Sequence, residues 1–92
     1  MQELLHILSN PTRLRILMCL ARKSKNVAEL IGTCGLAQSA VSQHLGKLKR
    51  AGLVASERRG KYVYYKLTYP EAATLADAMH KFIRRVMRSP NS

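Results

Sequence analysis

The fold is decided by residues 36–52, LAQSAVSQHLGKLKRAG. Val41, Leu45 and Leu48 recur at helical spacing and predict one buried face. The opposite face has no acid and no bulky apolar group, and it consists of Ser39, Gln43, Gly46, Lys47 and Arg50. A solvated face usually mixes Glu with Lys, whereas a hydroxyl, an amide, a glycine and two cations suit contact with a negative, hydrogen-bonding surface. We therefore expect a helix that lays its polar face against a polyanion.

A capping sequence marks the start of an earlier helix. Asn10-Pro11 predicts a helix start, because Asn can cap free N–H groups and Pro has no N–H that the first turn would leave unpaired. The apolar residues that follow recur at helical spacing, so we expect a helix to about Arg22 that buries this stripe. The stripe consists of Leu14, Leu17, Met18 and Ala21. A short apolar helix should precede Asn10.

A turn and a third, short helix should come next. Residues 23–25, KSK, are expected to form an exposed turn. Asn26 and Glu29 have the spacing of a capping box, in which each side chain accepts from the other residue's backbone N–H. Gly35 stands where this helix should end, because a left-handed residue is common there. The helix of residues 36–52 then completes a helix-turn-helix order.

Residues 53–67 predict a β-hairpin, because two β-prone runs meet at Gly60. Side chains alternate along the second run, so one face should pack on the helices while the other stays wetter. The packed face would hold Val63, Tyr65 and Leu67, and the wetter face Tyr62, Tyr64 and Lys66. Arg58, Arg59 and Lys61 cluster at the tip. A long helix should follow from Pro70 through Val86.

Length and composition indicate one globular domain, residues 1–92, with a polyanionic partner. Sixteen Lys and Arg against five Asp and Glu give a formal net charge of +11. Hydrophobic residues make up 47% of the chain and charged residues 23%, a balance that favours a folded core over a basic tail. The longest apolar stretch, residues 16–21, is too short for a membrane span or a signal peptide, so we expect a cytoplasmic protein without membrane contact. Residues 89–92 are expected to be a frayed end.

Four segments together resemble the ArsR/SmtB family of bacterial transcriptional repressors in their order and spacing. They are LSNPTRLRIL (8–17), LAQSAVSQHL (36–45), GLV (52–54) and YVYYKL (62–67). The resemblance implies a mainly α fold with a small β-hairpin wing, a winged helix-turn-helix that forms a homodimer through its first and last helices. It also implies that the helix of residues 38–51 enters the major groove of an inverted-repeat operator in double-stranded DNA.

The chemistry of the polar side chains agrees with that expectation. The amides of Gln38 and Gln43 can pair with an adenine edge, and the cations can meet phosphate. The predicted DNA-binding residues are Gln38, Ser39, Ser42, Gln43, Lys47, Arg50, Arg58, Arg59 and Lys61. Gln38 could instead cap its helix. His44 lies beside the apolar stripe, where a half-buried packing role is favoured over base contact.

Both terminal helices carry more apolar surface than one small core can cover, which favours a homodimer. The predicted interface residues are Leu4, Leu5, Leu8, Leu75, Met79, Phe82 and Val86. A basic row on the last helix consists of Lys81, Arg84, Arg85 and Arg88. We expect this row to be a solvated face rather than a nucleic-acid contact.

The resemblance also implies where sensor residues would stand, and this chain departs from each pattern. Glu29-Leu30 is not followed by cysteines, and Asp77 and His80 have the wrong spacing for the zinc type of site. The family's dithiol positions hold no cysteine either. We therefore expect no metal or cofactor and can name no inducer. Cys19 and Cys34 are expected to pack as small hydrophobic groups, with a redox-responsive repressor that uses either thiol as the alternative.

Two other classes of function are the alternatives. An RNA- or ribosome-associated winged helix would use the same charge without reading bases, so it would bind scrambled and operator duplexes equally. An enzyme would need a nucleophile paired with a base, and Ser42 and His44, two residues apart on a helix, do not face each other. The sequence holds no paired carboxylates and no Gly-rich phosphate loop. We therefore expect no catalysis.

Overall fold

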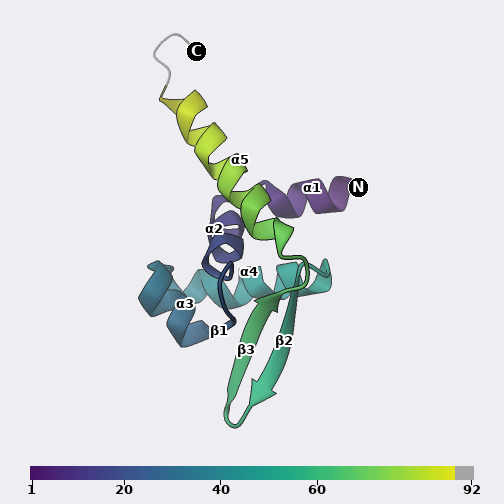
Figure 1. The fold of residues 1–92 in the computed structure, drawn as a ribbon, viewed down its shortest axis with the longest axis vertical. Coiled ribbons are helices and arrows are strands. Elements are labelled where there is room, and N and C mark those ends of the chain that lie inside the picture. The colour runs from purple at the N-terminus through teal and green to yellow at the C-terminus, as the bar shows by residue number, and fades with distance from the viewer. Residues whose placement is uncertain (89–92) are drawn as a thin grey trace.

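The computed structural model describes residues 1–88 as five helices and a small sheet (Figure 1). The helices are α1 (Gln2–Leu8), α2 (Pro11–Cys19), α3 (Val27–Cys34), α4 (Gln38–Arg50) and α5 (Glu71–Met87). The strands are β1 (Lys25–Asn26), β2 (Val54–Arg59) and β3 (Tyr62–Leu67). This order confirms the predicted winged helix-turn-helix, in which α3 and α4 form the helix-turn-helix and β2 and β3 form the wing. The frayed end predicted for residues 89–92 lies outside the described residues.

The predicted cap begins α2. The Asn10 side-chain oxygen accepts from the backbone N–H of Arg13 at 3.1 Å, and Pro11 occupies the first turn. The helix ends at Cys19 rather than near Arg22, and Ala21 is exposed rather than buried, so both expectations were wrong. The physical reason is a tighter final turn, in which the N–H of Ala21 bonds to the carbonyl of Met18 and the chain then bends away.

The capping box of α3 is confirmed. Glu29 N–H donates to the Asn26 side chain at 2.8 Å, and Asn26 N–H donates to the Glu29 carboxylate at 3.0 Å. The exposed turn expected at residues 23–25 is only partly correct, because Lys25 is 9% exposed and belongs to β1. Backbone pairing with Tyr65 of β3 draws this residue into the sheet.

The sheet has the order β1-β3-β2, and all of its pairs are antiparallel. The hairpin pairs Val54 with Leu67 at its base and Arg59 with Tyr62 at its tip. Gly60 turns the chain with φ +62°, a conformation that L side chains rarely adopt. On β3, Tyr65 and Leu67 pack against the core as predicted. Val63 does not, because it lies near the tip beyond the helices, and it is 38% exposed.

One hydrophobic core lies between α2, α3, α4 and the base of the sheet, with α5 packed across α2. Its largest fully buried side chains are Leu14, Ile16, Leu17, Leu30, Val41, Leu45 and Leu48. Helix α5 buries only three alanines of its first half. Its second half projects from the body on the side opposite the wing (Figure 1). Within residues 1–88, no helix is long and apolar enough to cross a membrane.

Candidate nucleic-acid interface

Helix α4 is anchored on one face and free on the other. Val41, Leu45 and Leu48 are at most 1% exposed and fix the rotation of the helix about its axis. Gln38, Ser39, Ser42, Gln43 and Arg50 are exposed, whereas Gly46 and Lys47 are half-buried. Helix α4 contains no acidic residue, and its last turn holds three cations. The helix therefore presents an uncharged N-terminal half and a cationic C-terminal half to solvent.

The start of α4 decides between the two roles considered for Gln38. Ala37 occupies the N-cap position, and no side chain caps the helix. Gln38 is exposed rather than turned toward the core, so a capping role for it was wrong. The preceding turn is set by Gly35 in the left-handed region (φ +65°) and by the buried side chain of Leu36. This geometry leaves the Gln38 amide free for an external partner.

A buried arginine connects α4 to α1 and was missed by sequence reasoning. Arg13 is 3% exposed, and its guanidinium donates to the carbonyls of Ile7 at 2.6 Å and His6 at 3.2 Å. It also lies 3.1 Å from Nδ1 of His44 on α4. The last carbonyls of a helix have no partner within the helix, so a cation suits the C-terminal end of α1. Arg13 thus couples α1 to α4.

The same contact defines the state of His44. Arginine carries only donors, so Nδ1 of His44 accepts and the ring is neutral, with its proton on Nε2. Burial, followed by the positive charges of Arg13 and Lys47, lowers the pKa of His44 from its usual 6.5. His44 is half-buried, which confirms the predicted packing role.

The cations of the wing differ in their hydrogen-bond and ion-pair partners. Arg59 donates to the Glu57 carboxylate at 2.6 Å and lies 4.7 Å from the centre of the Tyr64 ring. The hydrogen bond and charge of Arg59 lower the pKa of Glu57. Arg58 donates one N–H to the carbonyl of Gly60 at the turn, and Lys61 lies over the ring of Tyr62. Of the three cations at the tip of the wing, Arg58 and Lys61 therefore have no acidic partner in the described structure.

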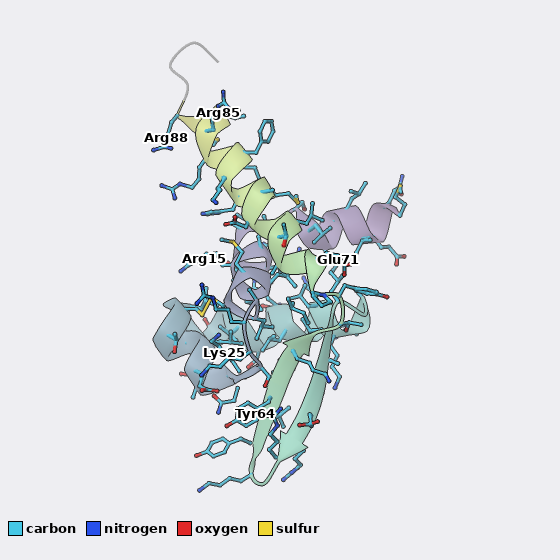
Figure 2. All side chains as sticks on the ribbon, in the orientation of Figure 1. Arg15, Lys25, Tyr64, Glu71, Arg85 and Arg88 are labelled. Carbon is cyan, nitrogen blue, oxygen red and sulfur yellow. A yellow bond between two sulfur atoms is a disulfide. The ribbon has the colours of Figure 1, made fainter. Side chains whose placement is uncertain are left out.

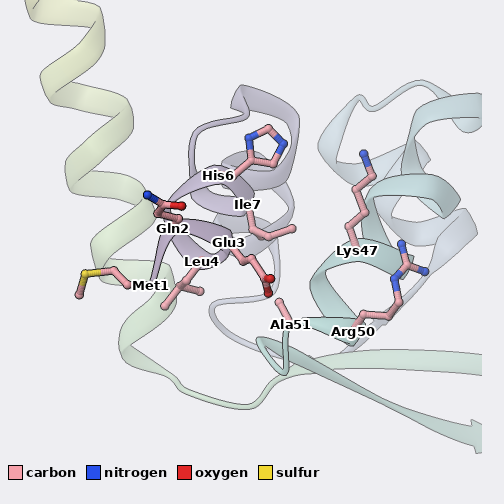
Figure 3. A pocket seen from close by; sticks show the side chains of 9 residues that line it. All are labelled: Met1, Gln2, Glu3, Leu4, His6, Ile7, Lys47, Arg50 and Ala51. Carbon is pink, nitrogen blue, oxygen red and sulfur yellow. The ribbon is translucent and has the colours of Figure 1, made fainter.

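A cleft of about 740 Å³ separates α1 from the C-terminal half of α4 (Figure 3). Lys47, Arg50 and Ala51 form one wall. The other wall consists of Met1, Gln2, Glu3, Leu4, His6 and Ile7. Glu3 brings an acid to the cleft, but within residues 1–88 it forms no ion pair with the two cations. The cleft keeps Lys47 and Arg50 accessible beside α1.

The predicted dimer residues form exposed apolar surface on α1 and α5. Leu4, Leu5, Leu75, Phe82 and Val86 are between 43% and 66% exposed. Leu8 and Met79 are half-buried and pack partly against the core of their own chain. The basic row of α5 is exposed, and Lys81 pairs with Asp77 at 2.9 Å. Arg85 and Arg88 lie toward the end of α5, away from the wing and Tyr64 (Figure 2).

The two cysteines form a disulfide, which the sequence analysis did not predict. Cys19 ends α2 and Cys34 ends α3, and both pack against the core as predicted. The two helix ends meet with the Cα atoms 6.3 Å apart, a separation that a disulfide can span. The 15-residue spacing of the cysteines gave no signal of this meeting. In the described part of the chain, no three His, Cys, Asp or Glu side chains group as a metal site would require.

Comparison with known proteins agrees with this geometry. Residues 10–56 match the family described as bacterial regulatory protein, arsR family. The chain is 38% identical over 86 residues to the HTH-type transcriptional regulator Rv0081 of Mycobacterium tuberculosis, covering 92% of this chain and 75% of the relative.

Two solved structures are also similar. The transcriptional repressor BigR from Xylella fastidiosa has a TM-score of 0.75 at 36% identity, over 88% of this chain and 83% of that one. The homodimeric winged helix-turn-helix DNA-binding domain of Mb0332 from Mycobacterium bovis has a TM-score of 0.73 at 27% identity, over 94% and 80% of the two chains. Similarity thus extends over the helix-turn-helix, the wing and most of α5.

Proposed function

Because this chain belongs to the arsR family of bacterial regulatory proteins, a family of transcriptional regulators, we propose that it represses transcription by binding an inverted-repeat operator as a homodimer. The observation that carries the proposal is the free face of α4, which has amides and hydroxyls on its first half and cations on its second. Gln38, Ser39, Ser42 and Gln43 would contact base edges. Lys47, Arg50 and the wing residues Arg58, Arg59 and Lys61 would contact phosphate.

A homodimer is supported by the apolar surface of α1 and α5. Leu4, Leu5, Leu75, Phe82 and Val86 would be covered by the same surface of a second copy, with Leu8 and Met79 at the edge of each core. The similar domain of Mb0332 is homodimeric, which supports the same assembly here. We propose that residues 1–92 act as one winged helix-turn-helix domain in the cytoplasm, where bacterial DNA lies.

The test is binding of the purified chain to genomic fragments, followed by footprinting and by fluorescence anisotropy on the duplex that emerges. The proposal predicts an operator bound about a thousandfold or more tightly than a scrambled duplex of the same length. Equal affinity for the two duplexes would contradict it. Tighter binding to RNA than to either duplex would favour the RNA-associated alternative.

A further inference from the structure

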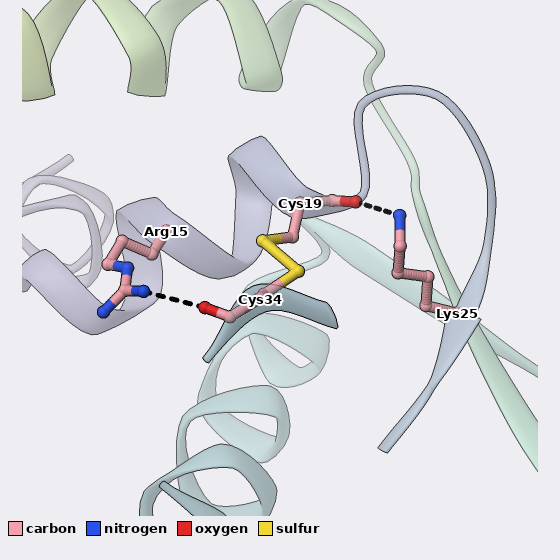
Figure 4. The surroundings of a disulfide bond; sticks show 4 residues. All are labelled: Arg15, Cys19, Lys25 and Cys34. Carbon is pink, nitrogen blue, oxygen red and sulfur yellow. Dashed lines mark hydrogen bonds between the residues drawn. A yellow bond between two sulfur atoms is a disulfide. The ribbon is translucent and has the colours of Figure 1, made fainter. Parts of the chain in front are cut away.

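The Cys19–Cys34 disulfide lies beside the turn of the helix-turn-helix, between α3 and α4 (Figure 4). Cys34 is the last residue of α3, and the chain reaches the first residue of α4 after only Gly35, Leu36 and Ala37. Cys19 is the last residue of α2, the helix that packs beneath α4 and α5. The bond therefore ties the turn that leads into the recognition helix to the central helix of the core.

Two cations bind the backbone of the disulfide residues. Arg15 donates to the carbonyl of Cys34 at 2.7 Å, and Lys25 donates to the carbonyl of Cys19 at 2.5 Å. Each cation thus donates a hydrogen bond to the backbone carbonyl of one of the two cysteines, as Figure 4 shows. Both cysteines are half-buried rather than sealed in the core. Exchange proceeds through attack of a thiolate on a disulfide, and the partial exposure of both residues gives a small disulfide access to them.

Lys25, which donates to the carbonyl of Cys19, also connects the disulfide to the wing. Lys25 lies in β1, which pairs with Tyr65 of β3, the second strand of the hairpin. Opening the disulfide would thus release α3 from α2 beside both DNA-reading elements. Disulfides are rare in reducing compartments, where those that form are usually transient and redox-sensing. This favours a reversible bond over a permanent staple.

We propose that Cys19 and Cys34 are a thiol–disulfide exchange site for low-molecular-weight disulfides, and that the bond holds the turn between α3 and α4 in its DNA-binding arrangement. One thiolate attacks the small disulfide, forms a mixed disulfide and releases one small thiol. The second protein thiolate then attacks the mixed disulfide, closes Cys19–Cys34 and releases the second small thiol. The protein loses two electrons, the small disulfide gains them, and the two protein protons leave on the small thiols.

The regulatory part of this proposal rests on the proposed DNA binding, so the exchange is measured without DNA. The wild-type chain is equilibrated in mixtures of glutathione and glutathione disulfide. Its free thiols are then alkylated, and its mass is measured by mass spectrometry. The expected result is a single transition between a doubly alkylated form and a form that takes no label. Accumulation of stable glutathione adducts without the internal bond would overturn the exchange site.

Amide hydrogen exchange in the same mixtures tests the conformational part. Reduction should increase exchange at residues 31–35, where the N–H of Gly35 bonds to the carbonyl of Ile31, and lower the melting temperature by roughly 10 to 20 °C, because the closed bond restrains a 15-residue loop. The variants Cys19→Ser and Cys34→Ser should match the reduced wild type and should not respond to the glutathione mixture. Unchanged exchange at residues 31–35 on reduction of the wild type would overturn this part.

DNA affinity is measured last, on the reduced and the oxidised wild type. We expect about tenfold weaker operator binding after reduction, a typical size for coupling between two sites. Equal affinity in the two states would overturn the regulation. Loss of operator preference in both states would instead contradict the proposed function, while the mass and exchange measurements would still decide the disulfide site.

Discussion

Arg13 binds the C-terminal end of α1. Its side chain is buried and satisfies two carbonyls at the end of α1 while contacting His44. Replacing it by alanine would remove the donor to the Ile7 carbonyl and to Nδ1 of His44, whereas the His6 carbonyl would keep the N–H and hydroxyl of Ser9. Arg13→Ala should lower the free energy of unfolding by about 2 to 3 kcal/mol. Urea denaturation would measure this loss.

The matched control is Arg22→Ala, because Arg22 is exposed and has no hydrogen bond or ion pair among the described contacts of the chain. This control should change the free energy of unfolding by no more than about 0.5 kcal/mol. Equal losses in the two variants would show that the Arg13 contacts contribute nothing beyond those of a surface arginine.

His44 predicts a pH dependence with a definite sign. Its pKa is below 6.5 in the folded chain, chiefly through burial, and returns toward 6.5 on unfolding. The unfolded chain therefore binds the His44 proton more tightly, so this residue makes stability fall as the pH drops through 6.5. The fall ends below the folded-state pKa, and above about pH 7.5 the contribution of His44 is flat.

The check is urea denaturation of the wild type and His44→Asn between pH 5 and pH 8. The Asn amide oxygen retains an acceptor near the position of Nδ1 but does not titrate. The variant should lose stability less steeply than the wild type below pH 6.5. Parallel profiles would exclude His44 as the source of the slope.

Local signals at single residues were predictable, and tertiary ones were not. Asn10 and Asn26 each cap the helix that they precede, so short sequence patterns predicted both caps. Arg13 lies one helical turn before Leu17 on the buried face, but a charged residue there is buried only because the end of α1 supplies carbonyl acceptors. Sequence spacing carried no information about those acceptors.

At the scale of elements, α4 and the wing should contribute differently to DNA binding. Gln43→Ala removes an amide from the free face of α4 and should reduce discrimination between operator and mismatched duplexes by about 1 to 3 kcal/mol. Affinity for a scrambled duplex should stay nearly unchanged. Anisotropy titrations on both duplexes would measure the difference.

The wing counterpart is Arg58→Ala, because Arg58 has no acidic partner whereas Arg59 is held by Glu57. This variant should weaken operator and scrambled duplexes alike. A dimer that neutralises about eight phosphates should have a slope near −7 for log affinity against log salt concentration, and each lost phosphate contact should reduce it by about 1. Identical effects of the two variants would refute the division between α4 and the wing.

Elements with a regular spacing of apolar residues were predictable, whereas short elements without one were not. Helix α4 shows a regular buried stripe over 13 residues, so its position and exposed face were predicted correctly. Strand β1 has only two residues, too few for any alternation, and it exists because β3 supplies backbone partners. The early end of α2 likewise depends on the tight turn at Met18 and Ala21.

At the scale of the whole molecule, the apolar surface of α5 should hold two copies together. Phe82 is 66% exposed and central to that surface, so Phe82→Glu should place a charge in the interface and give monomers. Arg84→Glu is the matched control, because Arg84 lies on the other side of the helix and should leave the dimer intact. Light scattering at micromolar concentration would distinguish monomers from dimers. A dimeric Phe82→Glu variant would show that α5 does not form the interface.

The exposed apolar surface of the terminal helices was predictable, but the way in which a second copy would cover it was not. Excess apolar residues on the first and last helices are visible in the sequence, and the structure leaves them exposed. How two copies pack depends on the fit between their surfaces, and no periodic pattern in a single sequence predicts that fit. The central claim, two α4 helices presented to adjacent major grooves, is therefore a claim about geometry.

Hydroxyl-radical footprinting of the operator tests that geometry most directly. Two protomers related by a two-fold axis should protect two symmetric half-sites whose centres lie about 10 base pairs apart, or a multiple of that spacing. Protection on one side only, or uniform protection without a two-fold pattern, would contradict it.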